Sequence, residues 1–111
     1  MIEFATVKLQ KICNCRKAAE RTCGPERATK VRLRLDDLAA ASTLEDMRCA
    51  PGRCHERTGN DAGVIPLDLD GPYRLIFEPA EQPPPTKPDG GLDWQAVTAV
   101  RILGIDQPHG D

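Results

Sequence analysis

Residues 64–77 read Val-Ile-Pro-Leu-Asp-Leu-Asp-Gly-Pro-Tyr-Arg-Leu-Ile-Phe, and this stretch decides the fold class. Apolar and polar side chains alternate on both sides of Asp70-Gly71, a dipeptide typical of tight β-turns. The pattern predicts two strands joined in a hairpin. Pro66 has no N–H to donate, so its strand is expected at a sheet edge or at a bulge.

Helical signals lie upstream of this hairpin. Residues 1–5 have the pattern of a short strand, and Thr6 is suited to cap a helix that ends at Gly24. Pro25 is well placed to open a second helix, because proline is tolerated at the first helical position. The sequence therefore predicts a helical hairpin. Apolar residues of the second helix recur at spacings of three and four: Ala28, Val31, Leu35 and Leu38.

Between the two hairpins, Ser42 and Glu45 have the spacing of a capping box, which predicts a brief helical turn over Thr43–Met47. Side chains alternate again over Arg53–Glu56 and over Val97–Ile105, so strands are expected in both places. The helical half of the chain is thus followed by a half rich in strands.

Residues 79–93 contain five prolines and two glycines, which predicts a loop between the last two strands. A polyproline ligand is the alternative interpretation of this segment. A chain of 111 residues has room for one core of ordinary size. The sequence therefore predicts a single α+β domain over residues 1–111.

The composition argues against disorder, because 40% of the residues are hydrophobic and 29% are charged. No apolar run approaches the roughly 20 residues that span a bilayer, and residues 1–20 lack the pattern of a secretion signal. We therefore expect a cytoplasmic protein without membrane contact.

Five cysteines occur, an odd number that cannot pair completely within the chain, and we expect them to be thiols. A zinc site built from these cysteines and the two histidines is one alternative, which would make the protein a binding module. The sequence contains no Cys-x-x-Cys pair, so we expect no metal and no cofactor.

Charge is divided unevenly, because residues 1–35 hold nine Lys and Arg against three Glu, whereas residues 36–111 are strongly acidic. The basic part is a candidate for contact with RNA or the ribosome, and a solvated helix surface is the alternative. Its candidate contact residues are Lys8, Lys11, Arg16, Lys17, Arg27, Lys30 and Arg34.

Short segments form a pattern that goes beyond secondary structure. They are Leu35–Met47, Pro51-Gly52, His55 with Gly59, Gly71–Phe77, and the ending Val97–His109. In this order and at these separations they resemble the RelE/ParE superfamily of bacterial toxins and, within it, the HigB-like killer proteins.

The resemblance implies a toxin of a type II toxin-antitoxin module. Such a toxin is neutralised by a helix-turn-helix antitoxin (HigA-like) from a neighbouring gene, and the HigB branch cleaves mRNA on the ribosome. It also implies a small antiparallel sheet with the N-terminal helical hairpin packed on one face.

Metal-independent RNA cleavage needs a proton acceptor for the 2′-hydroxyl, a cation for the phosphate and a proton donor for the leaving oxygen. If residues 53–57 are extended, Arg53, His55 and Arg57 share one face. Arginine binds phosphate through a planar fork, and histidine titrates near neutral pH. Arg53 and Arg57 are therefore predicted RNA contacts.

The catalytic hypothesis assigns four residues. Arg74 neutralises the scissile phosphate, His55 and His109 share proton transfer, and Asp106 orients or activates one histidine. A structural salt bridge is the alternative role for Arg74, and a strand residue satisfied by its neighbours is the alternative for His55.

Two positions depart from the family pattern: Thr58 replaces the usual lysine, and Gln107-Pro108 replaces the tyrosine before the final histidine. These departures keep two alternatives open. One is a ParE-like inhibitor of DNA gyrase, which needs no catalytic histidine. The other is a catalytically decayed toxin that only binds its antitoxin.

Overall fold

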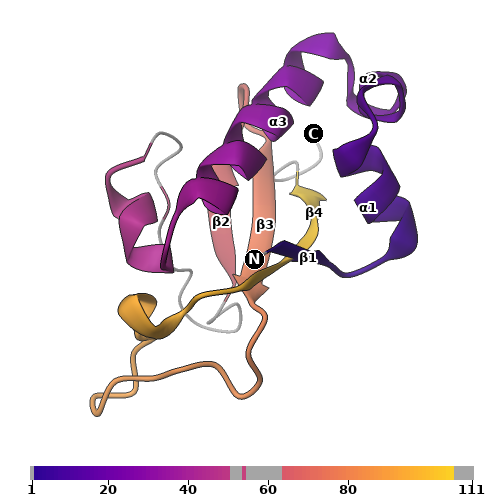
Figure 1. The fold of residues 1–111 in the computed structure, drawn as a ribbon. Coiled ribbons are helices and arrows are strands. Elements are labelled where there is room, and N and C mark those ends of the chain that lie inside the picture. The colour runs from indigo at the N-terminus through magenta and orange to yellow at the C-terminus, as the bar shows by residue number, and fades with distance from the viewer. Residues whose placement is uncertain (1, 51–53, 55–63, 107–111) are drawn as a thin grey trace.

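The computed structural model describes residues 2–50, 54 and 64–106, and α3 crosses one face of a four-stranded sheet (Figure 1). The predicted α+β class is confirmed. The strands are β1 (Ile2–Phe4), β2 (Ile65–Asp68), β3 (Arg74–Pro79) and β4 (Val100–Asp106). The helices are α1 (Val7–Asn14), α2 (Arg16–Cys23), α3 (Pro25–Ala40) and the 3₁₀ helices η1 (Leu44–Arg48) and η3 (Trp94–Ala96).

The strand order is β1-β4-β3-β2, and β3 runs antiparallel to both of its neighbours. β1 runs parallel to β4, so the expectation of an antiparallel sheet is wrong for this pair. Parallel neighbours need a long crossover connection, which the helices and the β2–β3 hairpin supply here. The sheet is therefore mixed.

The predicted β2–β3 hairpin is confirmed. The Leu69 N–H donates to the Tyr73 carbonyl and the Tyr73 N–H to the Asp70 carbonyl, each over 3.0 Å. β2 is an edge strand, as Pro66 predicted. Along an antiparallel strand, backbone N–H groups point alternately toward and away from the partner strand. Since the Leu69 N–H points toward β3, the nitrogen of Pro66, three residues earlier, points away from it. The missing N–H of Pro66 therefore removes no hydrogen bond between β2 and β3.

The first predicted helix is two helices, because Cys15 adopts an extended conformation (φ −122°, ψ 111°) between α1 and α2. Thr6 caps α1 as predicted, and its hydroxyl accepts the Leu9 N–H. A straight helix would place Cys13 and the pair Ala18-Ala19 on different sides. The break allows all three side chains to be buried.

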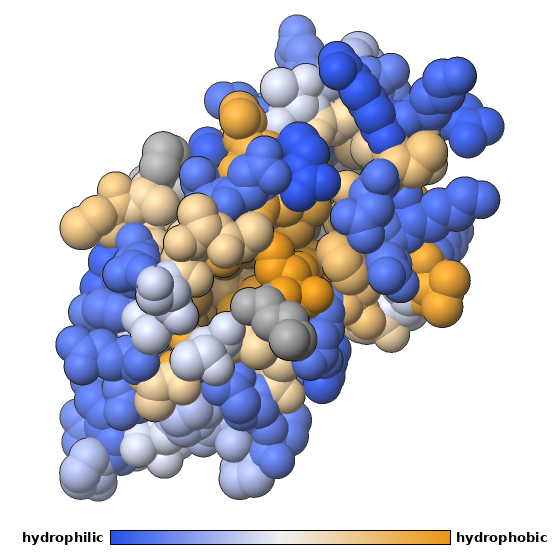
Figure 2. All heavy atoms as spheres, in the orientation of Figure 1, coloured by the Kyte–Doolittle hydropathy of each residue, from blue (hydrophilic) through white to orange (hydrophobic). Residues whose placement is uncertain are grey.

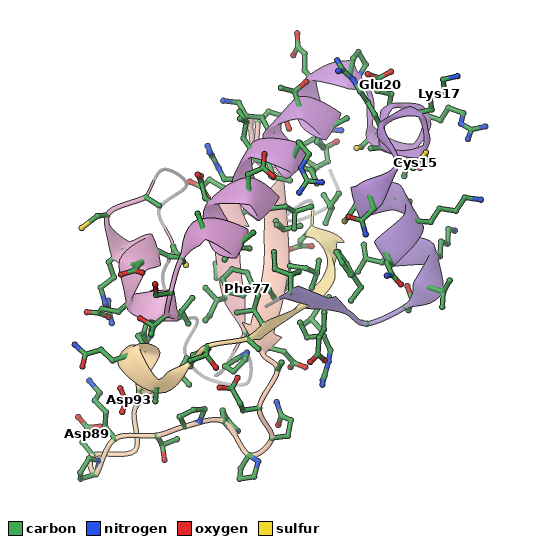
Figure 3. The ribbon with its side chains drawn as sticks, in the orientation of Figure 1. Cys15, Lys17, Glu20, Phe77, Asp89 and Asp93 are labelled. Atoms are coloured by element: carbon green, nitrogen blue, oxygen red, sulfur yellow. The ribbon has the colours of Figure 1, made fainter. Side chains whose placement is uncertain are left out.

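α3 supplies the helical side of the core. Its predicted stripe is confirmed, since Ala28, Val31, Leu35 and Leu38 are all buried. The sheet contributes alternate residues of β3, and Phe77 lies on the sheet behind α3 (Figure 3). The apolar residues that recur every three or four positions in α3 and every second position in β3 therefore form one buried cluster.

Two predicted boundaries are wrong. The Asp46 carboxylate, not that of Glu45, accepts the Ser42 N–H (2.9 Å), because the segment folds as the 3₁₀ helix η1. The last strand begins at Val100 rather than Val97, and residues 97–99 connect it to η3. Of the predicted strand Arg53–Glu56, Cys54 is described, without strand structure, and the other three residues lie outside the described part of the chain.

The proline-rich segment between β3 and η3 is a loop that projects beyond the ends of the strands, with Asp89 near its tip (Figure 3). A bridge between Thr86 and Leu92 closes its tip, and Leu92 and Trp94 anchor its end in the core. Separately, none of the described helices combines the length and apolar character needed to span a membrane.

Arg34 joins α3 to the outer edge of the sheet. It is buried, its Nε donates to the Asp68 carbonyl oxygen over 2.9 Å, and its guanidinium lies 3.7 Å from the Asp37 carboxylate. The Asp68 carbonyl faces away from β3, so Arg34 occupies an edge acceptor that another strand could otherwise bind.

We expect Arg34→Ala to lower the free energy of unfolding by about 1–3 kcal/mol, because it leaves this carbonyl without its donor. Urea denaturation measures the change. Arg16→Ala is the control, since Arg16 forms only an exposed pair with Glu20 and its loss should cost under about 0.5 kcal/mol. Equal losses in the two variants would show that Arg34 does not hold the edge.

Candidate functional site

The predicted catalytic residue Arg74 lies in a row of charges across three strands. Its Nε is 3.1 Å from Oδ1 of Asp68 on β2, and it is the register partner of Asp106 on β4. Directly opposed residues project to the same side of a sheet, so all three side chains share one face. This is the face opposite Leu75 and Phe77.

The structure brings together two of the four predicted catalytic residues, Arg74 and Asp106. The other two, His55 and His109, lie outside the described residues. The predicted RNA contacts Arg53 and Arg57 also lie outside them. Asp68 was not predicted, although it and Arg74 are equally distant from Gly71, which the hairpin register could have revealed.

A second charged row crosses the same face of the sheet. Arg101 on β4 is 3.0 Å from Glu78 on β3 and 3.8 Å from Glu3 on β1. Arg101 and Arg74 are almost equally exposed, at 32% and 33% of the side chain. Each arginine therefore has an acidic residue on both neighbouring strands.

A β-bulge in β4 keeps the two rows on one face. Ile76 is the register partner of Gly104, but Phe77 is the partner of Ile102, so β4 has one extra residue at this point. Without it, Ile102 would lie opposite Glu78 rather than beside Phe77 in the core. Sequence alternation alone carries no signal of this shift.

Arg27, a predicted RNA contact, connects α3 to the β2–β3 turn. Its guanidinium binds the Asp70 carboxylate in a forked pair (3.0 and 3.2 Å) and lies 3.3 Å from the centroid of the Tyr73 ring. Forked pairs and ring stacking are geometries specific to arginine. Arg27, like Arg34, is thus occupied within the fold.

Other predicted RNA contacts are on the surface. Lys30 is half-buried on α3. Four of the predicted contacts are exposed on α1 and α2, and Lys17 points away from the molecule (Figure 3). These four are Lys8, Lys11, Arg16 and Lys17.

The cysteines are free thiols in two environments. Cys15 and Cys49 are exposed, whereas burial raises the pKa of Cys13 to about 11 and that of Cys54 to about 12. Within the described part of the chain, no three His, Cys, Asp or Glu side chains are grouped so as to hold a metal ion.

No protein-family model matches the chain, and no curated protein matches it either. The resemblance to the RelE/ParE superfamily is carried by the quoted sequence segments alone.

Burial of Cys13 predicts a pH dependence of stability. A thiol that titrates near 9.0 when unfolded and near 11 when folded stabilises the fold below pH 9, and that contribution is lost as the pH rises toward 11. We expect the free energy of unfolding to fall more steeply over this interval in the wild type than in Cys13→Ala. If the free energy of unfolding has the same pH dependence in both proteins, the raised pKa of Cys13 is contradicted.

Proposed function

We propose that the protein is a RelE/ParE-like toxin that cleaves mRNA on the ribosome without a metal ion. The observation that carries the proposal is the pairing of Arg74 with Asp106 across β3 and β4. These residues are 32 positions apart in the chain, and the catalytic hypothesis assigns both to one site. The coarse fold, helices over a small sheet, supports the same proposal.

In this proposal Arg74 balances the charge of the scissile phosphate. A guanidinium has five N–H donors, and the bond from Nε to Asp68 uses one while holding the side chain in place. Asp106 orients a histidine, and His55 and His109 exchange protons with the 2′-hydroxyl and the leaving oxygen. The exposed lysines of α1 and α2 approach ribosomal phosphates.

A second candidate function is binding of the antitoxin without catalysis. The observation that favours it is the ion pair between Arg74 and Asp68, 3.1 Å from Nε to Oδ1, which binds the guanidinium within the fold. Arg101 is paired with Glu78 and Glu3 in the same way, so a structural role accounts for both arginines equally.

The matched rows provide the test. Expression of the wild type should arrest growth and produce transcript breaks within translated frames, mapped by sequencing RNA ends. Arg74→Ala should reduce cleavage by about 100-fold or more, because it removes the cation that stabilises the transition state. Arg101→Ala is the control and should cleave within about threefold of the wild type.

The outcomes separate the candidates. Equal loss of cleavage in both variants, with folding retained by circular dichroism, would show that Arg74 has no special role. A non-toxic wild type that still binds a helix-turn-helix protein from the neighbouring gene would support the second candidate. DNA damage with intact transcripts would instead support inhibition of gyrase.

A further inference from the structure

A groove separates the α1–α2 segment from α3 and has a volume of about 330 Å³. It lies apart from the charged rows of the sheet, since the described residues that line it belong to the three helices. Figure 2 shows hydrophilic side chains over much of this face of the molecule, with hydrophobic residues exposed between them.

The floor of the groove is aliphatic. Cys13 from α1, Ala19 from α2, and Ala28 and Val31 from α3 are all buried and line it. Leu33 extends this apolar surface to the rim and leaves 47% of its residue surface exposed. An exposed leucine beside an apolar hollow is typical of a binding groove rather than of scattered surface residues.

The rim is cationic. Arg16 of α2 and Arg32 of α3 both line the groove and pair with Glu20 and Asp36 one turn along their helices. The Arg32 guanidinium also donates to the Cys13 carbonyl of α1 over 3.3 Å. Arg16 leaves 84% of its side chain exposed. Glu20 is the one acidic residue in α1 and α2. These two helices carry five exposed basic residues: Lys8, Lys11, Arg16, Lys17 and Arg21.

The floor favours a peptide over a nucleic acid. Nucleic-acid sites pair cations with aromatic rings on which bases stack. No aromatic ring is among the lining residues that the structure describes, and the rings of Tyr73 and Trp94 are covered by Arg27 and Arg48. Aliphatic side chains on the partner would gain most from burial here.

We propose that this groove binds an amphipathic helix of a protein partner, with leucine-like side chains on its apolar stripe and carboxylates on both flanks. The apolar stripe covers the floor between Ala19 and Val31, and the carboxylates face Arg16 and Arg32. The proposal concerns a surface that the charged rows do not use, and it does not depend on RNA cleavage.

The test uses the full-length protein and a synthetic helical peptide of about 18 residues, with Leu at helical spacing on one side and Glu on both flanks. We expect a Kd of roughly 1–100 µM by fluorescence anisotropy, weakening as salt rises. A peptide with Lys in place of every Glu should bind at least about tenfold more weakly.

Variants locate the site. Leu33→Glu, which places a carboxylate at the apolar rim, should weaken binding at least about tenfold, and Arg16→Glu should do the same through charge. Val7→Glu is the matched control, because Val7 is an 82% exposed apolar residue that does not line the groove, and it should change Kd less than about twofold. Circular dichroism checks that every variant is folded.

Several results would overturn the proposal. They are no binding at about 1 mM peptide, equal binding of the lysine peptide, or equal effects of Leu33→Glu and Val7→Glu. Displacement of the peptide by single-stranded RNA would reassign the surface to nucleic acid. Concentration-dependent dimers that Leu33→Glu abolishes would show that a second copy of the chain covers the groove.

Discussion

Packing of α3 across the β2–β3 hairpin is the constraint on which the other features depend. Val31 and Leu35 of α3 and Leu75 and Phe77 of β3 have almost no exposed surface. Because alternate residues of a strand point to opposite faces, burial of Leu75 and Phe77 sends Arg74 to the other face. The position of the candidate catalytic arginine is therefore a consequence of the core.

The packing of α3 on the β2–β3 hairpin divides the basic residues of the N-terminal part into two groups. Arg27 and Arg34 point from α3 to the hairpin, where they bind Asp70 and the Asp68 carbonyl. The cations of α1 and α2 remain on the surface around an apolar groove. Some basic residues of the N-terminal part thus stabilise the fold, and others give one face of the molecule its positive charge.

The sheet face opposite α3 has a different electrostatic character. Its two arginines, Arg74 and Arg101, each lie between acidic residues on neighbouring strands. Cross-strand pairs of opposite charge stabilise a sheet, so this arrangement has a structural value of its own. A catalytic role for Arg74 is therefore distinguished from a structural one only by comparing the effects of replacing Arg74 and Arg101 on RNA cleavage.

Local chemistry was sufficient to predict several elements from the sequence. The Thr6 cap, the Pro25 start of α3, its apolar stripe and the turn at Asp70-Gly71 depend on neighbours within a few residues. Edge placement of Pro66 followed from its missing N–H. The candidate site was predicted in part, because the positions of Arg74 and Asp106 were named but their pairing was not.

The tertiary structure alone decided what depends on contacts between distant segments. The break at Cys15 lets α2 pack against α3 while α1 packs against β1 and β4. The parallel β1–β4 pair depends on where the crossover returns, and the bulge before Gly104 is set by burial of Ile102. Periodicity records which side chains avoid water, but it does not record which strand or helix covers them, because that is a property of the packed chain.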